Sequence, residues 1–480
     1  MPLLVVALGL DVALETDLPT GLPAGTPTAV FVFGHCFHPH AAVTRLTLLV
    51  DGVRHRPDAV AMPRRDLETW RRNQDLDPEG RSYRSGFWAV LPVPAPAGPG
   101  PVRVQAAVAV ADSEETVVEL GVIPVTEPAP VAATAGALGI ASPIAVCLAT
   151  YEPEPALFET QIASLRAQTD TRWSCVVSDG GSSPRALARI AEIIGEDPRF
   201  VVSPAGRRMD PYRNFERALS LAPAGAPLIA LCDQDDRWYP DKLATLRATL
   251  GDAMLAYSDL RLVTGDGRVV RESLWTGRRN EWHNLASVLV ANTIPGAAML
   301  FRRTLLRTAL PFPELPGFHY HDHWLALAAL AAGEVRYVDR PLYDYVQHGE
   351  AVMGDAARPA PRGARGSRGL RDAYFGGVVP RQVQARTLLL RADNTLAPRR
   401  RRALRWFLAA SRSPLAFAWL TLRPLRALAG RGETLGGEWA LARGIAWRRL
   451  VGHLARGPAD ARFPDPPRFE QPRLRRWRGG

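Results

Sequence analysis

Residues 228–240 read LIALCDQDDRWYP, and this stretch decides how the surrounding chain folds. It begins with an apolar run, which is typical of a strand buried in a sheet. Three carboxylates follow, at Asp233, Asp235 and Asp236. Because like charges repel, such a cluster needs a positive partner, most simply a divalent cation with oxygen ligands. An α/β sheet presents ligands at the carboxyl ends of its strands, so we expect the chemistry at this point.

The region around this stretch, residues 143–350, alternates strand and helix patterns. Apolar runs at 144–149, 173–177 and 200–202 predict further strands, and residues 156–167 have helical spacing. This alternation is typical of a mostly parallel sheet with helices on both faces. The predicted fold class of the region is therefore α/β.

Residues 1–128 have a different pattern, in which short alternating runs are separated by Pro and Gly. Strands are predicted at 30–33, 46–50, 86–91, 102–106 and 117–122. Asp51-Gly52 lies between two such runs and predicts a hairpin, because both central positions of that turn need positive φ. Several short strands at this spacing predict an all-β sandwich accessory domain, and residues 129–142, rich in Ala, Gly, Pro and Thr, predict a linker.

Residues 351–480 form an Arg-rich region with helical patterns at 403–408 and 415–420 and loops or disordered parts around 358–368 and after 456. From Ala356 onward there are 27 Arg and 7 acidic residues, a balance of +20, against −9 in the preceding residues. A solvated, partly disordered face and contact with anionic lipid or a lipid-linked acceptor are the alternatives. Nucleic acid is not expected, because no recognisable binding module accompanies the charge.

The four cysteines, Cys36, Cys147, Cys175 and Cys232, lack the spacing of a metal site. They are expected to be reduced core residues of a cytosolic protein. The N-terminus has no basic leader or cleavage site, and no apolar stretch reaches the roughly 18 residues that span a bilayer. We therefore expect a cytoplasmic protein, at most peripheral at the inner face of the cell membrane.

Polar residues follow two neighbouring strand ends of the α/β region, at 150–153 (TYEP) and 178–183 (SDGGSS). Paired glycines from Gly180 let backbone N–H groups approach a ligand, and the Asp179 carboxylate can accept a hydrogen bond from a base N–H. Together with the acidic cluster, these tips predict one pocket for a nucleoside diphosphate whose charge Mg²⁺ or Mn²⁺ neutralises. The alternatives are plain turns, and an acidic turn that caps a helix from Pro240.

Several motifs of this region occur together in one order. They are Thr150-Tyr151 and residues 178–182, 212–215, 233–243, 257–259, 292–297 and 321–324. With them, residues 143–350 resemble the inverting glycosyltransferases of family 2, and the acidic motif is particularly similar to rhamnosyltransferase-like members. The resemblance implies a GT-A nucleotide-sugar-binding, Rossmann-like domain.

The resemblance also implies roles for individual residues. Asp179 would contact the nucleotide base, Asp233 would contact the ribose or the metal, and Asp235 would be the principal metal ligand. His348 is implied as a further metal or diphosphate ligand, with a structural histidine as the alternative. The other residues implied on the donor side are Thr150, Tyr151, Glu152, Gly180, Asn214 and Gln234.

Asp322 is implied as the catalytic base. Independently, inversion by single displacement needs a carboxylate that takes the proton of the attacking hydroxyl. Asp322 lies between His321 and His323 and before the apolar run 324–327, so we expect it at a helix N-terminus, where the dipole would keep it ionised. The alternative is a helix cap.

The acceptor side is predicted from Gly296, His321, His323 and Trp324. Gly296 would let an acceptor approach its backbone, with a plain turn as the alternative. For Trp324, a place in the core or the pocket wall is favoured over a platform for a sugar. Asn214 is predicted to support the diphosphate side of the pocket, with a helix cap as the alternative.

These patterns predict an inverting, metal-dependent glycosyltransferase. It would move a sugar from a UDP- or dTDP-linked donor to a glycan or lipid-linked acceptor in cell-envelope polysaccharide synthesis. Two other classes stay open. A nucleotidyltransferase would use the same sheet and acidic cluster but would release pyrophosphate. A non-catalytic glycan-binding scaffold would carry a degenerate transferase domain, and the intact set of aspartates argues against it.

Overall fold

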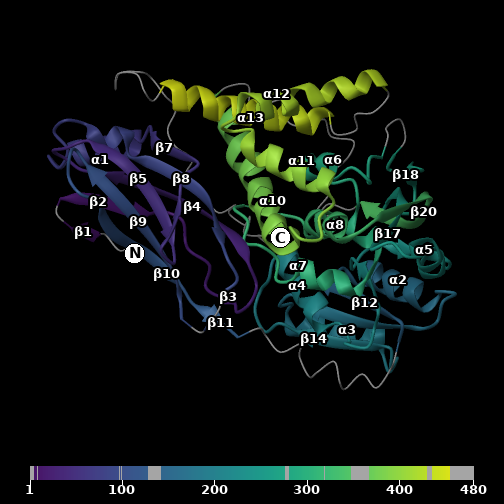
Figure 1. The fold of residues 1–480 in the computed structure, drawn as a ribbon. Coiled ribbons are helices and arrows are strands. Elements are labelled where there is room, and N and C mark those ends of the chain that lie inside the picture. The colour runs from purple at the N-terminus through teal and green to yellow at the C-terminus, as the bar shows by residue number, and fades with distance from the viewer. Residues whose placement is uncertain are drawn as a thin grey trace.

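The structure (Figure 1) is a computed structural model that describes residues 5–7, 9–96, 98, 100–127, 142–275, 280–317, 319–347, 367–429 and 435–454. Strands dominate the N-terminal region, an α/β region with a mixed sheet follows, and the C-terminal region is helical. Apart from Ser142, the expected linker lies outside the described residues. The predicted domain boundaries stay a prediction.

Two sheets dominate the N-terminal region. The first has the order β1 (Val5–Ala7), β2 (Leu10–Leu14), β4 (Thr28–Phe37), β8 (Gly86–Val93) and β7 (Ala59–Met62). The second has the order β10 (Thr116–Ile123), β9 (Val102–Val110), β5 (Val43–Val50) and β6 (Val53–His55). The smaller elements are β3 (Leu22–Pro23), β11 (Val125–Thr126), the helix α1 (Arg65–Arg72) and the 3-10 turn η1 (Arg81–Arg84). Asp51 and Gly52 join β5 to β6 with φ values of 47° and 79°, as the hairpin pattern predicts.

Strands β4 and β8 of the first sheet are buried on both faces. Because side chains alternate along a strand, Val30 of β4 joins the core between the two sheets, while Phe31 joins a second core. In that second core the ring of Trp88 from β8 lies 5.1 Å from the ring of Phe375, which belongs to the C-terminal region. The N-terminal sheets therefore form part of a larger packed body.

Among the described residues, nine strands form the sheet of the α/β region. Their order is β14 (Phe200–Pro204), β13 (Trp173–Asp179), β12 (Ile144–Thr150), β15 (Leu228–Cys232), β19 (Met299–Arg302), β17 (Leu255–Thr264), β20 (Val335–Gln347) and β16 (Arg237–Trp238), and β18 (Val269–Arg271) pairs with β17. The first four strands are parallel, as predicted. Strand β19 runs antiparallel to β15 and β17, so the sheet as a whole is mixed.

The helices of this region begin close to the strand ends. They are α2 (Pro155–Arg166), α3 (Pro184–Ile194), α4 (Pro211–Leu221), α5 (Lys242–Leu250), α6 (Leu285–Val290), α7 (Leu306–Ala309) and α8 (His321–Ala332), with 3-10 turns η3 (Gly296–Ala298) and η4 (Arg303–Leu305). In α2, α3 and α4 an acceptor side chain precedes a first-turn Pro. These acceptors are Glu154, Ser183 and Asp210. The acceptor side chain satisfies one N–H group of the first turn, and proline has no N–H that would need a partner. Together, the two residues fix where each helix begins.

The C-terminal helices pack between the two preceding regions. They are α9 (Ser367–Asp372), the π-helical turn η5 (Ala373–Val378), α10 (Val379–Ala392), α11 (Pro398–Ala409), α12 (Pro414–Leu422), the 3-10 turn η6 (Arg423–Ala429) and α13 (Leu435–Leu454). Figure 1 shows α10 between the N-terminal sheets and the α/β region, and Thr387 of α10 accepts a hydrogen bond from Ala29 N–H at 3.1 Å. The described C-terminal helices thus pack against both other regions, while residues such as Arg402 and Arg443 are exposed, so the solvated face stays a prediction. The residues predicted as loops lie mostly outside the described ranges.

Three arginines of α10 and α11 satisfy helix ends in the α/β region. Arg381 donates to the last two carbonyls of α6, and Arg391 donates to the last two carbonyls of α7, at 2.9–3.1 Å. Arg400 donates to the carbonyls of Leu330 and Gly333 at the end of α8, at 2.6 and 2.7 Å. Because the last carbonyls of a helix have no partner in the helix and carry partial negative charge, a guanidinium stabilises them.

Two predictions from composition concern cysteines and membrane spans. All four cysteines are free and buried, as predicted. Among the described residues, no helix combines the length and the apolar character needed to cross a bilayer.

Candidate active site

Three strand ends meet at one edge of the mixed sheet. Strand β12 lies between β13 and β15, and all three run parallel, so their carboxyl ends point the same way. In this register Thr150 is the partner of Asp179. The N–H of Tyr151 donates to Gln234 Oε1 at 2.9 Å, which ties the end of β12 to the loop after β15. The structure thus brings together the three segments for which one pocket was predicted.

Asp179 holds the turn after β13 together, and its side chain is fully buried. Its Oδ1 accepts hydrogen bonds from the backbone N–H groups of Gly181 at 3.1 Å and Ser182 at 2.9 Å. Its Oδ2 accepts from the hydroxyls of Thr150 at 3.1 Å and Ser182. All four acceptor positions of the carboxylate are therefore used inside the protein. The contact with a nucleotide base stays a prediction, and it would have to displace one of these hydrogen bonds.

Gly180 and Asn214 use their polar groups within the fold, which corrects the expectation of a free N–H at Gly180. The N–H of Gly180 donates to the Thr150 carbonyl at 2.7 Å, so it is not free to meet a ligand. A Cβ at Gly180 would lie 3.0 Å from the amide nitrogen of Asn214. Asn214 is buried, accepts from Ser178 Oγ at 2.7 Å and donates to Thr150 O at 3.0 Å, so it supports the strand ends, and its role on the diphosphate side stays a prediction. It is not a helix cap either, because Asp210 is the N-cap of α4.

Tyr151 and Glu152 directly follow β12, at the same edge of the sheet. Glu152 is exposed, has a φ of 42°, and accepts a hydrogen bond from the N–H of Ser183 at 2.6 Å. The guanidinium of Arg208 lies 4.6 Å from the centre of the Tyr151 ring. An exposed guanidinium held against a ring is suited to meet a phosphate. The sequence analysis missed Arg208, because nothing local distinguishes it from the many other arginines.

The carboxylates after β15 repel one another in a buried setting. Burial, followed by the neighbouring Asp235 and Asp322, raises the pKa of Asp233 to about 7, although part of the residue surface is still exposed. Burial, followed by Asp233 and Asp235, raises the pKa of Asp236 well above its usual range. Among the described residues neither oxygen of Asp236 has a hydrogen-bond partner of normal geometry, although the N–H of Val346 approaches. The influence of Asp322 on Asp233 means that two distant segments of the chain converge here.

Lys242 brings positive charge to this acidic cluster. It is fully buried, and its Nζ donates to the carbonyl of Ala297 at 2.5 Å. Nζ also lies 3.6 Å from the ring centre of Trp238 and 4.2 Å from that of Tyr343. Burial lowers the pKa of Lys242 to about 7, while Cys232, Asp236 and Asp233 act against that shift.

The sequence analysis named Lys242 only as part of a motif, although its residue type could have indicated a special role. It is the only lysine among 59 basic residues. Its compact ammonium lies between two rings in a fully buried space, which the larger guanidinium group of an arginine would have to widen. The basic residue nearest the cluster in sequence, Arg237, instead pairs with the fully buried Asp344.

Asp322 lies in the first turn of α8, at the helix N-terminus where it was expected. Tyr320 is the N-cap, so Asp322 is not the cap itself. Burial raises the pKa of Asp322 to about 7, although hydrogen bonds from the His323 N–H, at 2.6 Å, and from Asn292 and Gly296 act to lower it. The expectation that the helix end keeps Asp322 ionised is thus corrected, because burial outweighs it. A carboxylate with this pKa is suited to general-base catalysis near neutral pH.

Trp324 and His323, predicted on the acceptor side, pack within the protein. Trp324 is fully buried and its Nε1 donates to the carbonyl of Ala309 at 2.8 Å, so it lies in the core, the position that was favoured for it over contact with an acceptor. The Nε2 of His323 lies 2.8 Å from the carbonyl oxygen of Val288. Burial lowers the pKa of His323 to about 3, so the ring is neutral and donates to that carbonyl.

His321 and Gly296 form a tight contact with each other. The ring of His321 stacks on Phe215 with centres 3.6 Å apart, and burial lowers its pKa to about 3. A Cβ at Gly296 would lie 2.5 Å from His321 Nε2. The close approach that requires glycine here is therefore made by His321, which corrects the expectation of an acceptor at this backbone. The Nε2 of His321 is buried with no hydrogen-bond partner among the described residues.

The chemistry of the acidic cluster fits a divalent cation. Among the described residues, no three His, Cys, Asp or Glu side chains are placed to hold a metal together. Mg²⁺ is commonly held by one or two carboxylates, with substrate phosphates completing its shell. Asp233 and Asp235, half-buried at the strand end, supply such a pair of hard oxygen ligands. His348 lies outside the described residues, so its predicted role stays a prediction.

Aspartates gather above the carboxyl ends of parallel strands in this α/β domain, which is where such sheets bind their ligands. Residues 145–308 match the model of the family described as Glycosyl transferase family 2, about a third of the chain. Residues 145–308 therefore carry a domain of glycosyl transferase family 2, and the mixed sheet of this region is GT-A-like.

Individual relatives are more distant. The chain is 29% identical over 120 residues to the uncharacterized protein y4gI of Sinorhizobium fredii, an alignment that covers 24% of this chain and 13% of that protein. It is 19% identical to residues 1–349 of TarS of S. aureus, solved with UDP-GlcNAc, over 65% of this chain and 91% of that one, with a TM-score of 0.42. It is 18% identical to the mannosyltransferase PcManGT of Pyrobaculum calidifontis, solved with GDP-Man and Mn2+, over 66% and 88%, with a TM-score of 0.34.

Proposed function

We propose that this glycosyltransferase moves a sugar from a nucleoside-diphosphate donor, UDP- or dTDP-linked, to a hydroxyl of a glycan or lipid-linked acceptor, with inversion at the anomeric carbon. Rhamnosyl transfer in cell-envelope polysaccharide synthesis is the specific form that the acidic motif suggests. The observation that carries the proposal is the convergence of Asp322 with Asp233, where each carboxyl group has a pKa of about 7.

The donor half of the proposal is supported by the three strand ends. Tyr151, Glu152, Asp233, Gln234 and Asp235 are all at least partly exposed at that edge. Bound there, Mg²⁺ or Mn²⁺ would be held by Asp233 and Asp235 and would neutralise charge on the departing diphosphate. A nearby cation would stabilise these carboxylates, because neither oxygen of Asp236 has a hydrogen-bond partner of normal geometry among the described residues.

Asp322 carries the acceptor half as the catalytic base. Its carboxylate takes the proton of the acceptor hydroxyl, the hydroxyl oxygen bonds to the anomeric carbon, and the bond from that carbon to the diphosphate oxygen breaks. Asn292 and the N–H groups of Gly296 and His323 orient the carboxylate. The pKa of about 7 leaves a useful fraction ionised at neutral pH while keeping the group a competent base.

Thermal unfolding with nucleoside diphosphates tests the donor half. UDP and dTDP are expected to raise the melting temperature with Mn²⁺ or Mg²⁺ and not with EDTA, and ligand at 100 times its Kd stabilises a protein by about 2.7 kcal/mol. Asp235→Asn should remove this metal dependence. Asp252→Asn, an exposed carboxylate away from the cluster, is the matched control. Equal stabilisation with EDTA would contradict the metal.

Product analysis tests the reaction class. With a UDP- or dTDP-sugar and an acceptor glycan, release of nucleoside diphosphate and a new glycosidic bond of inverted configuration are expected. Release of pyrophosphate from a nucleoside triphosphate and a sugar phosphate would instead identify a nucleotidyltransferase.

A further inference from the structure

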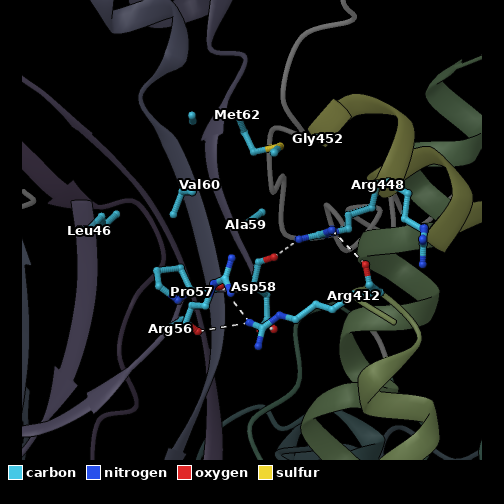
Figure 2. Close-up of a pocket in the computed structure, with 13 residues that line it drawn as sticks. Leu46, Arg56, Pro57, Asp58, Ala59, Val60, Met62, Arg412, Arg448 and Gly452 are labelled. Atoms are coloured by element: carbon cyan, nitrogen blue, oxygen red, sulfur yellow. Dashed lines mark hydrogen bonds and ion pairs between the residues drawn. The ribbon is translucent and has the colours of Figure 1, made fainter. Parts of the chain in front are cut away.

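A cavity of about 660 Å³ lies between the N-terminal sheets and the C-terminal helices, far in sequence from the acidic cluster. We call it the seam cavity. One wall is the edge strand β7 with the residues before it, from Arg56 to Met62. The other wall is Ser411 and Arg412 after α11 and the α13 residues Arg448, Arg449 and Gly452. Figure 2 shows Arg412 and Arg448 reaching from the helical side toward Asp58.

The seam cavity has an excess of positive charge. Four arginines line it, Arg56, Arg412, Arg448 and Arg449. Of the described residues in its lining, Asp58 is the single carboxylate, and it pairs with Arg412 at 2.9 Å. Behind the lining, burial and then Arg412 lower the pKa of Arg386, against the opposite effect of Asp58. The charge balance thus remains positive even after the one ion pair is counted.

The guanidinium groups keep donors that the protein does not use. Arg412 makes its bonds to Asp58 and to the carbonyls of Arg56 and Pro57 through Nη2. Arg448 donates to the carbonyls of Ser411 and Asp58, yet its Nε is buried with no partner among the described residues. A guanidinium has five N–H donors, and because the printed bonds of the exposed Arg412 all leave from Nη2, its Nη1 and Nε can donate to an oxyanion.

The backbone at the seam cavity is unusual as well. Strand β7 shifts its register against β8 between Ala59 and Met62. Inside this bulge Ala61 has a φ of 54°, a conformation that residues other than glycine rarely adopt. Bulges on edge strands re-aim side chains, and this one displays Val60, which is 45% exposed, on the cavity wall.

We propose that the seam cavity binds an organic phosphate, a phosphate ester or phosphodiester whose oxygens are held by Arg56, Arg412 and Arg448. Arginine forks match phosphate oxygens, and the exposed Arg56 and Arg412 and the half-buried Arg448 share a single carboxylate among the described residues of the lining. The cavity is much larger than a phosphate ion, and Leu46, Val60 and Met62 give it an apolar wall. The ligand therefore carries an organic group next to its phosphate. This site is separate from the proposed transfer site and does not depend on it.

Calorimetric titration of the full chain with glucose 1-phosphate tests the inference. Binding is expected, weakening as salt is added, since exposed charge pairs are screened. Arg56→Glu should weaken it about tenfold, because one charge-assisted contact becomes repulsive. Arg56 is exposed and no described residue pairs with its side chain, so this variant is expected to fold. Val60→Trp, which fills the cavity without changing charge, should weaken binding similarly.

Two matched controls separate this site from others. Arg54→Glu changes an exposed arginine that pairs with Glu115 and does not line the cavity, so binding should be unchanged. Asp235→Asn should leave glucose 1-phosphate binding intact even if it abolishes glycosyl transfer. Failure of the transfer proposal is thus distinguishable from failure of this one.

A second experiment, co-sedimentation with phosphatidylglycerol vesicles, identifies the source of the phosphate. Vesicle binding that Arg56→Glu and Val60→Trp both abolish supports a lipid headgroup as the source, and glucose 1-phosphate binding with no vesicle binding supports a soluble ester. The inference is overturned if neither probe binds, if inorganic phosphate binds as tightly as the ester, or if both cavity variants bind as the unaltered protein does.

Discussion

Buried charges lack partners in the acidic cluster after β15, whereas they form ion pairs in the Arg-rich C-terminal helices. In the cluster, Asp236 has both oxygens buried with no partner of normal geometry among the described residues, and Asp233 and Asp322 have pKa values of about 7. In the helices, Arg423 donates to the fully buried Glu438 at 2.9 Å. Buried charges that are paired hold a fold together, whereas buried charges left unpaired mark where a ligand completes the structure.

The same contrast explains why so many arginines occur in the C-terminal region. Helix carbonyls of the α/β region accept hydrogen bonds from Arg381, Arg391 and Arg400. Arg423 and Arg426 share Glu438, and both also reach Ser287 of α6. The seam cavity departs from this rule within the same region, because its arginines outnumber its single carboxylate.

The largest effect is expected from Asp322→Asn, which removes the base and leaves the shape of the site. Transfer should fall by about 10²–10⁴-fold, the usual contribution of general-base catalysis. Donor affinity, measured by calorimetry with Mn²⁺, should be retained, because the substitution leaves Asp233 and Asp235 in place. Asp252→Asn serves as control. Unchanged turnover in Asp322→Asn would remove this residue as the base.

Lys242→Met should remove a positive charge that acts on the buried acidic cluster. The buried carbonyl of Ala297 also loses its donor, so a loss of about 3 kcal/mol is expected. Urea denaturation should show this loss. Lys242→Arg should also destabilise, since the space between the Trp238 and Tyr343 rings suits an ammonium. The exposed Arg402→Met is the control, and an unchanged midpoint in Lys242→Met would mean that Lys242 does not compensate the cluster.

Arg423→Met should destabilise the protein by removing one of the buried ion pairs of the C-terminal helices. A loss of about 2 kcal/mol is expected, lower than for Lys242 because Arg426 still donates to Glu438. Nucleoside diphosphate binding should be unchanged, since the network lies away from the strand ends. The exposed Arg443→Met provides the comparison. Equal stability of the two variants would show that the Arg423 pair contributes nothing.

A further prediction is a dependence of stability on pH. The pKa values of Asp233 and Asp322 are about 7 in the folded protein, against about 4 in an unfolded chain. The folded state thus holds more protons between these values, so the melting temperature of the metal-free protein should fall as pH rises from about 4 to about 7. Asp322→Asn should flatten this slope, as should saturating Mn²⁺. An equal slope in the variant would contradict the assignment.

Local patterns predicted much of the fold correctly. The apolar runs at 144–149, 173–177 and 228–232 and the Asp51-Gly52 turn depend on near neighbours in the chain, and each appears where it was expected. The antiparallel β19 was missed, because strand direction in a sheet depends on pairing between distant segments. The predicted site residues lie in two different settings. Asp322 lies near Asp233, whereas Trp324 lies in the core.

The sequence by itself determined that carboxylates follow a buried strand and that an aspartate opens an apolar helix, because both depend on residues adjacent in the chain. Only the tertiary structure decided what those groups experience. Gly296 contacts His321, Asn214 braces Thr150, and Lys242 is enclosed by rings beside the acidic cluster. Burial and electrostatic fields come from segments far apart in sequence, and therefore they arise only when the chain has folded.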